Sequence, residues 1–331
     1  MIRFLFTLIV LLTTTSIFAQ KTVFQGIPFQ GGTFEEVADK LYAWEIYQID
    51  AKALDMFVKK AGDESTFKLN LGNHIWDIQL QKRDLRSPNY IMRTLTDKGV
   101  ETTSAFDGTM TYRGQMPDIQ GWSVALTLNE EFIYGYFDEG EETYFIEPLW
   151  YFVPGQPKDL YIIYAESASK PDSFHKCGAD VMMEKMEELD PKKHAEHNEG
   201  VAEKMMACKE IELAIAADLS MHSFHGSTAA VNAFTFGVMN DVQTNYDNEF
   251  NDELHFNIVE QFVVAPPATD PWTSSNDAGN LLNSFTSWGP GGFAATHDLG
   301  QLWTKRNLAR GTVGIAWLCA VCANNRYHVV S

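Results

Sequence analysis

The sequence has 331 residues and a net charge of −19, from 25 basic and 44 acidic side chains. So acidic a chain repels phosphate backbones, which excludes nucleic acid as a partner. A hydrophobic share of 45% is ample for packed cores and excludes wholesale disorder. The length fits two domains of ordinary size.

The first twenty residues have the layout of a secretory signal peptide. Arg3 supplies the positive start, residues 4–12 the apolar core and residues 13–19 a more polar exit, with cleavage expected between Ala19 and Gln20. The alternative is a transmembrane anchor, but a membrane span needs about 20 apolar residues. We therefore expect a secreted, extracellular protein with no stable membrane span, and a signal peptide over residues 1–19.

Residues 20–167 are predicted to form a β-rich domain, as a sandwich or a barrel. Strands are predicted where apolar and polar residues alternate, at 67–71, 122–126 and 144–146, with hairpin turns at 107–108 and 138–140. One helix is expected early in this domain, over residues 33–43. Residues 168–208 then change to a charged, proline-containing composition that predicts a linker with a solvated helix in it.

Residues 209–331 alternate strand and helix patterns, which predicts an α/β domain. Strands are expected over 211–215, 254–264 and 311–318, with another beginning at 326. One helix is expected after a cap at Ser227, and a second after Ser274 or Ser275, ending at the glycine-rich residues 289–292. Because the chain stops inside the last expected strand, we predict an incomplete domain.

Three blocks in this region carry a resemblance to a known family. They are KEIELAIAAD at 209–218, THDLGQL at 296–302 and GIAWL at 314–318, followed by Cys322. In this order they resemble the catalytic domain of adamalysin/reprolysin-type (ADAM-like) metzincins, which are zinc metalloproteases. The resemblance implies an opening strand, then a helix-turn at 296–302, then the edge strand of the substrate cleft. It therefore makes Gly314, Ile315, Ala316, Trp317 and Leu318 substrate-binding residues, because an exposed edge pairs with an extended peptide.

The zinc site of that family is absent from the sequence. Its motif is H-E-x-x-H-x-x-G-x-x-H, in which histidines four apart on a helix bind zinc and the glutamate activates water. No H-E-x-x-H occurs in the 331 residues. His222 and His225 are expected in a surface loop after the first strand and do not replace it. We therefore expect a precursor that is truncated before its zinc site, has no catalytic residues and is inactive as given.

Residues upstream resemble the pro-domain of the same protease group. The best matching blocks are YFIEPL at 144–149 and YRG at 112–114. Near the end of this region Lys176-Cys177-Gly178 resembles a cysteine switch, in which a thiolate of Cys177 would fill the open position of the zinc. The alternative is a structural disulfide of Cys177 with Cys208, and the sequence leaves both open. A dibasic pair, Lys192-Lys193, is a weak candidate for a processing site.

The resemblance also gives two smaller expectations. It implies that Cys322 bonds to a cysteine farther along the chain, whereas Cys319 has no counterpart. It further makes Glu212 and Asp298 candidate calcium ligands, since calcium prefers oxygen donors. The alternative is two ordinary surface carboxylates.

The function expected from these observations is that of a secreted zinc metalloendopeptidase precursor, with an extracellular protein or peptide as substrate. Its cofactor would be zinc, with calcium as a second candidate. The alternative is a non-catalytic, secreted, β-rich binding protein, and a third reading is a pro-domain-like inhibitor acting in trans through a free thiol at Cys177. The sequence does not give the substrate, the cysteine pairing or the oligomeric state.

Overall fold

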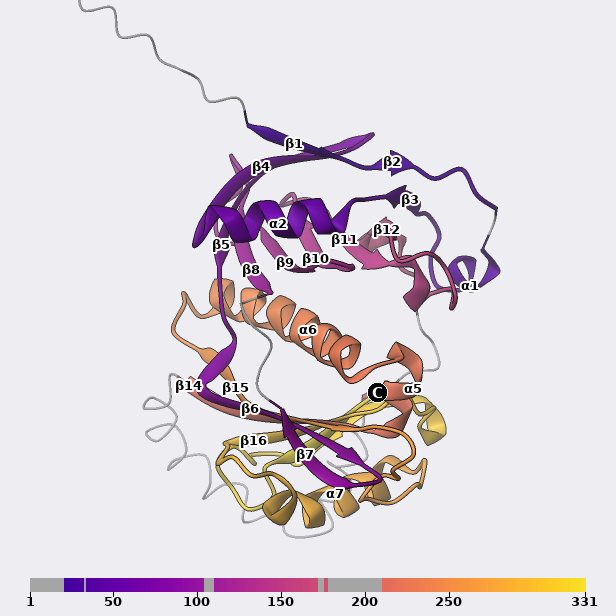
Figure 1. The fold of residues 1–331 in the computed structure, drawn as a ribbon, viewed down its shortest axis with the longest axis vertical. Coiled ribbons are helices and arrows are strands. Elements are labelled where there is room, and N and C mark those ends of the chain that lie inside the picture. The colour runs from indigo at the N-terminus through magenta and orange to yellow at the C-terminus, as the bar shows by residue number, and fades with distance from the viewer. Residues whose placement is uncertain (1–20, 33, 104–109, 172–175, 178–209) are drawn as a thin grey trace, which may run out of the picture.

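A computed structural model describes residues 21–32, 34–103, 110–171, 176–177 and 210–331. Their strands form two sheets, and a long helix lies between the sheets (Figure 1). The predicted signal peptide, the turn at 107–108 and residues 178–208 of the predicted linker lie outside the described residues. No helix in the described part of the chain is both long and apolar enough to cross a membrane.

The first sheet has ten strands and is nearly closed into a barrel. In sheet order its strands are β1 (Thr22–Gln25), β4 (Glu64–Leu71), β5 (His74–Lys82), β8 (Thr111–Gln115), β9 (Val124–Asn129), β10 (Phe132–Asp138), β11 (Thr143–Pro148), β12 (Leu160–Ala165), β3 (Glu45–Gln48) and β2 (Ile27–Pro28). The two end strands, β1 and β2, are consecutive in the chain and separated only by Gly26. The chain therefore brings the two ends of the sheet together, which leaves little free edge.

Helix α2 (Ala51–Ala61) packs against this curved sheet. Asp50 begins the helix by accepting a hydrogen bond from the backbone N–H of Ala53 at 2.9 Å, a standard N-cap. Leu54 and Val58, one turn apart, are buried against the apolar side chains of the barrel, while Met56 on the opposite side is exposed. The barrel thus has its own apolar core.

The second sheet has eight strands. In sheet order they are β13 (Lys176–Cys177), β17 (Thr312–Ala316), β18 (Tyr327–Val330), β16 (Leu299–Trp303), β14 (Glu210–Ala217), β15 (His255–Val264), β6 (Arg86–Thr96) and β7 (Gly99–Thr103). Strand β14 pairs in parallel with β15 and β16 at the centre. Leu213 and Ile215 pack on one face and Ala214 and Ala216 on the other, as the alternation of side chains in a strand requires. Both faces are covered, which explains why the buried part of β14, residues 213–217, is wholly apolar.

The hairpin of β6 and β7 comes from the N-terminal half of the chain, inside the range predicted for the β-rich domain. It leaves the barrel after β5 and joins the second sheet, where β6 runs parallel to β15 (Figure 1). The N-terminal half of the chain therefore contributes strands to both sheets.

Helix α6 (Thr228–Glu249) lies between the barrel and the second sheet (Figure 1). Ser227 caps it, as the sequence predicts, by accepting from the N–H of Ala230. No residue between Val231 and Thr244 is exposed. Gly237 lets the helix approach strand β10 closely, because a Cβ there would lie 2.8 Å from the ring of Tyr134.

The remaining helices in the described part of the chain are α1 (Glu35–Ala38), α5 (Leu219–His225) and α7 (Ala278–Gly292), with short 3-10 turns at Leu149–Tyr151, Glu166–Ala168 and Ala309–Gly311. Four sequence-based expectations are wrong here. The early helix has one turn instead of covering 33–43, and α7 is capped by Asp277, which accepts from the N–H of Asn280, rather than by Ser274 or Ser275. His222 and His225 lie in α5, not in a loop.

The fourth correction concerns the block at 296–302, which was expected to be a helix-turn. Its second half begins strand β16, which pairs with β14 on one side and β18 on the other. Gly300 fits there because the ring of Tyr327 occupies the space where a side chain would lie. Leu302 is fully buried, so this short segment belongs to the core.

We predict that Gly237→Ala lowers the stability of the protein. Alanine favours a helix by up to about 1 kcal/mol over glycine. The new methyl group would nevertheless press on the ring of Tyr134, and overpacking of this kind costs about 1–3 kcal/mol. Urea unfolding checks this, with Gly291→Ala in α7 as the matched control, since no atom lies within 4 Å of a Cβ built there. Equal effects of the two substitutions would contradict the close approach.

Candidate functional site

Strand β17 lies toward one end of the second sheet and contains the first three predicted substrate-binding residues. It runs antiparallel to β18, with Gly314 opposite Val330 and Ala316 opposite His328. Ile315 points into the core and is 5% exposed, so it supports the strand rather than facing a ligand. The strand ends at Ala316.

Trp317 and Leu318 follow β17 and take different positions. The indole N–H of Trp317 donates to the hydroxyl of Thr286 on α7 at 2.9 Å, which fixes this ring against the helix. Leu318 is 42% exposed. Of the five predicted substrate-binding residues, therefore, Gly314 and Ala316 offer backbone groups on the strand, and Leu318 offers an exposed apolar side chain just beyond it.

The other side of β17 is occupied by two residues from the end of the N-terminal part. Lys176 and Cys177 form strand β13, which runs parallel to β17 with Lys176 opposite Thr312 and Cys177 opposite Gly314. The candidate latch residue thus lies, by its backbone, at the strand predicted to bind substrate. Cys208, its alternative disulfide partner, lies outside the described residues, as do the histidines of the linker at 194 and 197.

Of the two candidate calcium ligands, Glu212 lies on β14 and Asp298 directly precedes the adjacent strand β16. The carboxylate of Asp298 accepts from the backbone N–H of Glu212 at 3.0 Å, and the N–H of Asp298 donates to the carbonyl of Glu212 at 2.8 Å. Cys322 joins them, because its Sγ donates to the same carboxylate at 3.2 Å. Asp298 therefore holds the loop of Cys319 and Cys322, both exposed and both at positive φ, against the start of β14.

Metal-binding side chains do not gather elsewhere in the described residues. No group of three or more histidine, cysteine, aspartate or glutamate side chains comes together in them. Glu212 and Asp298 lie together, but the contacts between them are hydrogen bonds through the backbone N–H and carbonyl of Glu212.

His225 was expected at the surface, and this is wrong. It is 8% exposed and lies among aromatic rings, with ring centroids 4.6 Å from Phe234 and 5.1 Å from Tyr151 of the barrel. Burial, and then the positive charges of Lys305 and Lys158, lower its pKa from the usual 6.5 to about 3. The spacing of the two histidines could not reveal this, because the barrel that covers His225 is distant in the sequence.

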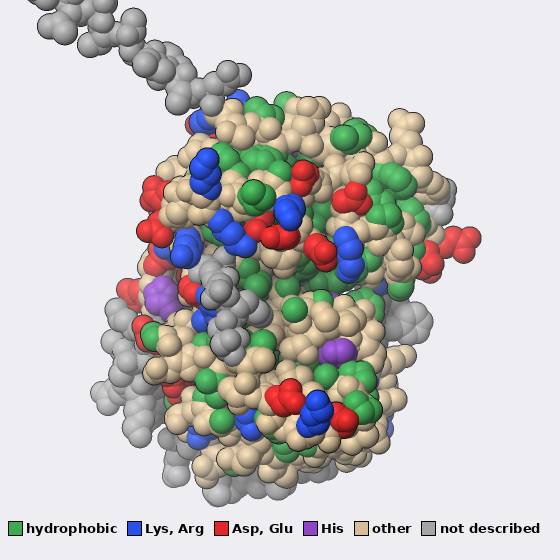
Figure 2. All heavy atoms as spheres, in the orientation of Figure 1, with side chains coloured by type: hydrophobic (Ala, Val, Ile, Leu, Met, Phe, Trp, Pro, Cys, Tyr) green, Lys and Arg blue, Asp and Glu red, His purple; other side chains and the backbone are tan. Residues whose placement is uncertain are grey.

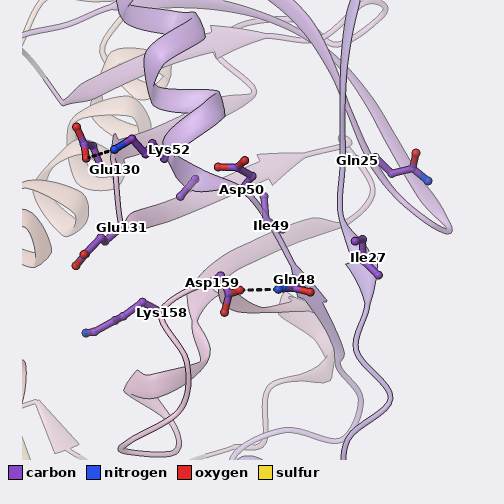
Figure 3. A pocket seen from close by; sticks show the side chains of 11 residues that line it. Gln25, Ile27, Gln48, Ile49, Asp50, Lys52, Glu130, Glu131, Lys158 and Asp159 are labelled. Carbon is purple, nitrogen blue, oxygen red and sulfur yellow. Dashed lines mark hydrogen bonds and ion pairs between the residues drawn. The ribbon is translucent and has the colours of Figure 1, made fainter.

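A hollow of about 470 Å³ lies elsewhere, at one end of the barrel (Figure 3). Four of its lining side chains form two pairs. Lys52 bonds to Glu130 at 3.0 Å, and Gln48 bonds to Asp159 at 2.6 Å. It is built from barrel elements alone, and β17 contributes nothing to it. Over the face of the molecule in Figure 2, basic and acidic side chains are intermixed.

We expect Asp298→Ala to lower the free energy of unfolding by about 1–3 kcal/mol, because the amide of Glu212 loses its acceptor. Asp298→Asn keeps an acceptor oxygen and should cost less. Thermal melts with and without a calcium chelator check both this contact and the calcium prediction. If calcium binds here, the chelator lowers the melting temperature of the natural protein but not that of the alanine variant. A chelator without effect on the natural protein contradicts a calcium site.

The buried His225 predicts a loss of stability in acid. The folded protein keeps this imidazole neutral down to about pH 3, whereas the unfolded chain takes up a proton near pH 6.5. The neutral imidazole therefore contributes its full stability above pH 6.5. As the pH falls from 6.5 toward 3, protonation of the unfolded chain lowers the free energy of unfolding, and this loss reaches about 2 kcal/mol at pH 5. Denaturant unfolding across this range should show a flatter profile for His225→Phe. His222→Phe, at a half-buried neighbour, is the control and should change the profile less.

A known protein family matches the part of the chain that contains β17 and the Glu212–Asp298 contact. A family model described as Reprolysin_5, metallo-peptidase family M12, matches residues 207–331. The matched residues begin just before β14 and include β17, the 319–322 loop and the Glu212–Asp298 contact. Residues 207–331 are thus similar to metallopeptidases of family M12, which indicates a metalloprotease.

Proposed function

We propose that the chain is the front part of a secreted zinc metalloendopeptidase precursor of the adamalysin/reprolysin type. In this proposal the barrel is the pro-domain, and residues 210–331 supply one wall of the substrate cleft. The family match supports the peptidase class. The observation that carries the precursor role is strand β13, which pairs with β17 at the position where a substrate would bind.

The pairing of β13 with β17 gives a physical basis for inhibition. An extended peptide binds an edge strand through the N–H and C=O groups that the edge leaves free. Lys176 and Cys177 use these groups around Gly314. A substrate must therefore displace the end of the N-terminal part before it can pair with β17, whether or not the thiol of Cys177 also binds a metal.

Zinc, which family M12 generally uses, finds no set of ligands among the described residues. The motif H-E-x-x-H is absent from the 331 residues, and no cluster of three metal-binding side chains exists among the described residues. We therefore derive no hydrolytic step, and the proposal for these residues concerns the binding of substrate and its blocking.

The first test is to read the coding sequence beyond the Ser331 codon. The proposal expects an open frame that soon encodes H-E-x-x-H-x-x-G-x-x-H. The complete protein should then contain zinc by elemental analysis and cleave a denatured protein substrate in a chelator-sensitive manner. A stop codon with no such motif nearby would overturn the proposal in favour of a non-catalytic binding protein.

The complete protein also tests the latch. Cys177→Ser should raise the peptidase activity of the uncleaved precursor if its thiolate blocks the metal, because serine does not replace the thiolate as a zinc ligand. Cys319→Ser is the matched control, since Cys319 is exposed and distant from β13 in the sequence. Peptide mapping without reduction separates the alternative, because a bond between Cys177 and Cys208 would appear directly as a linked peptide pair.

A further inference from the structure

Strand β6 is built into the second sheet over most of its length. Its register with β15 runs from Ile91 opposite Glu260 to Leu95 opposite Val264, with an irregularity before it. Strand β7 continues the sheet beyond β6. The β15 edge of the C-terminal part is thus covered by the N-terminal part, which uses backbone hydrogen bonds to do so.

One face of this junction contains a buried charge. Glu260 of β15 is fully buried, and its counter-ion is Arg93 of β6 at 2.9 Å. The other carboxylate oxygen accepts from the N–H groups of Ala294 and Ala295, both at 2.7 Å. Arg93 also donates to the carbonyl of Gly292 at 2.8 Å. The hairpin therefore supplies the cation that neutralises a carboxylate inside the C-terminal part.

The opposite face of the junction is held by a second polar contact. The hydroxyl of Tyr90 on β6 donates to the side chain of Gln261, the residue after Glu260, at 2.5 Å. Gln261 in turn donates to the hydroxyl of Thr235 on α6. Both faces of β15 are therefore tied to the hairpin, because Arg93 bonds to Glu260 and Tyr90 bonds to Gln261.

Helix α6 repeats this arrangement at the barrel. Asp247 is 2% exposed, and Arg83 and Arg113 both bond to it, the latter at 2.9 Å. The side-chain amide of Asn240 donates to the carbonyls of Tyr112 and Leu126 in β8 and β9, at 3.0 and 3.2 Å. A second buried carboxylate of the C-terminal part thus takes its positive partners from the N-terminal part.

Separation of the two parts would be costly. It would leave Glu260 and Asp247 without their arginines in an apolar setting, or require both sites to rearrange and take up water. It would also bare the β15 edge and the apolar side of α6. We propose that residues 21–171 are a lasting structural partner of residues 210–331, and that they stay bound after cleavage within the connecting residues 178–209.

This inference does not depend on zinc or on peptidase activity. Under this inference Lys176 and Cys177 can leave β17 while the barrel and its hairpin stay in place. Release from inhibition then does not require the whole N-terminal part to dissociate. The partner recognised by the β15 edge and α6 is the N-terminal part of the same chain, through three arginine contacts to two buried carboxylates and a parallel strand.

The experiment inserts a site-specific protease sequence between residues 178 and 209 of the full chain. The purified protein is cut to completion, as verified on a denaturing gel, and then passed over a size-exclusion column in native buffer. We expect both fragments to elute together at the position of the uncut protein. Elution as two separate species would overturn the inference and would leave the proposed peptidase function standing.

A pair of variants tests whether the buried charge carries the association. Removing one partner of a buried ion pair should weaken binding of the cut fragments about a hundredfold or more, so Arg93→Leu should separate on dilution where the natural protein does not. Lys52→Leu removes an exposed ion pair within the barrel and should leave association unchanged. Equal dilution behaviour of the two variants would contradict the role of Arg93.

Hydrogen exchange on the natural sequence covers the case in which Arg93→Leu does not fold. The backbone amides of β15 and β6 should exchange at the same rate before and after the cut, because their ladder stays intact. A loss of protection in these strands after the cut would show that the N-terminal part leaves, and would overturn the inference.

Discussion

Helix α6 has no solvent-facing side along its middle, and this constraint governs the rest of the structure. A helix that packs on one layer needs one apolar stripe, but α6 packs on the barrel with one side and on the second sheet with the other. Its polar residues in that middle part must therefore find partners inside the protein. The side-chain amide of Asn240 donates to carbonyls of barrel strands, and the hydroxyl of Thr235 accepts from Gln261 of the second sheet. The helix consequently fixes the distance and the register between the two layers.

The second sheet follows from this arrangement. With α6 on one face and α7 on the other, its central strands are buried and must meet neighbours at both edges. At both ends the outermost strands come from residues that precede β14 in the chain, as the hairpin beside β15 and as β13 beside β17. The two additions differ in extent. The hairpin pairs over many residues and neutralises Glu260, whereas β13 pairs over two residues. The hairpin is therefore suited to stay bound, and β13 is suited to be released.

Much of the C-terminal part can be predicted from its sequence because its signals are local. The apolar run of β14, the cap at Ser227 and the strand around Phe256 all depend on residues within one element. The strand β16 is harder, because it is short and carries Gly300, whose fit depends on the ring of Tyr327 from another strand. The burial of His225 likewise depends on Tyr151, far away in the chain. Periodicity does not encode such partners.

The place of the β6–β7 hairpin in the second sheet also cannot be predicted from the sequence. Its sequence contains nothing that assigns the hairpin to one sheet or the other. The assignment is made by partners. In the pairing of β6 with β15, Arg93 lies opposite Phe262 and reaches the buried carboxylate of Glu260, two residues away on β15. A buried ion pair adds little net stability compared with apolar residues, but a mispaired charge is strongly disfavoured. Arg93 and Glu260 therefore act mainly by excluding other registers, in which each charge would be buried without a partner.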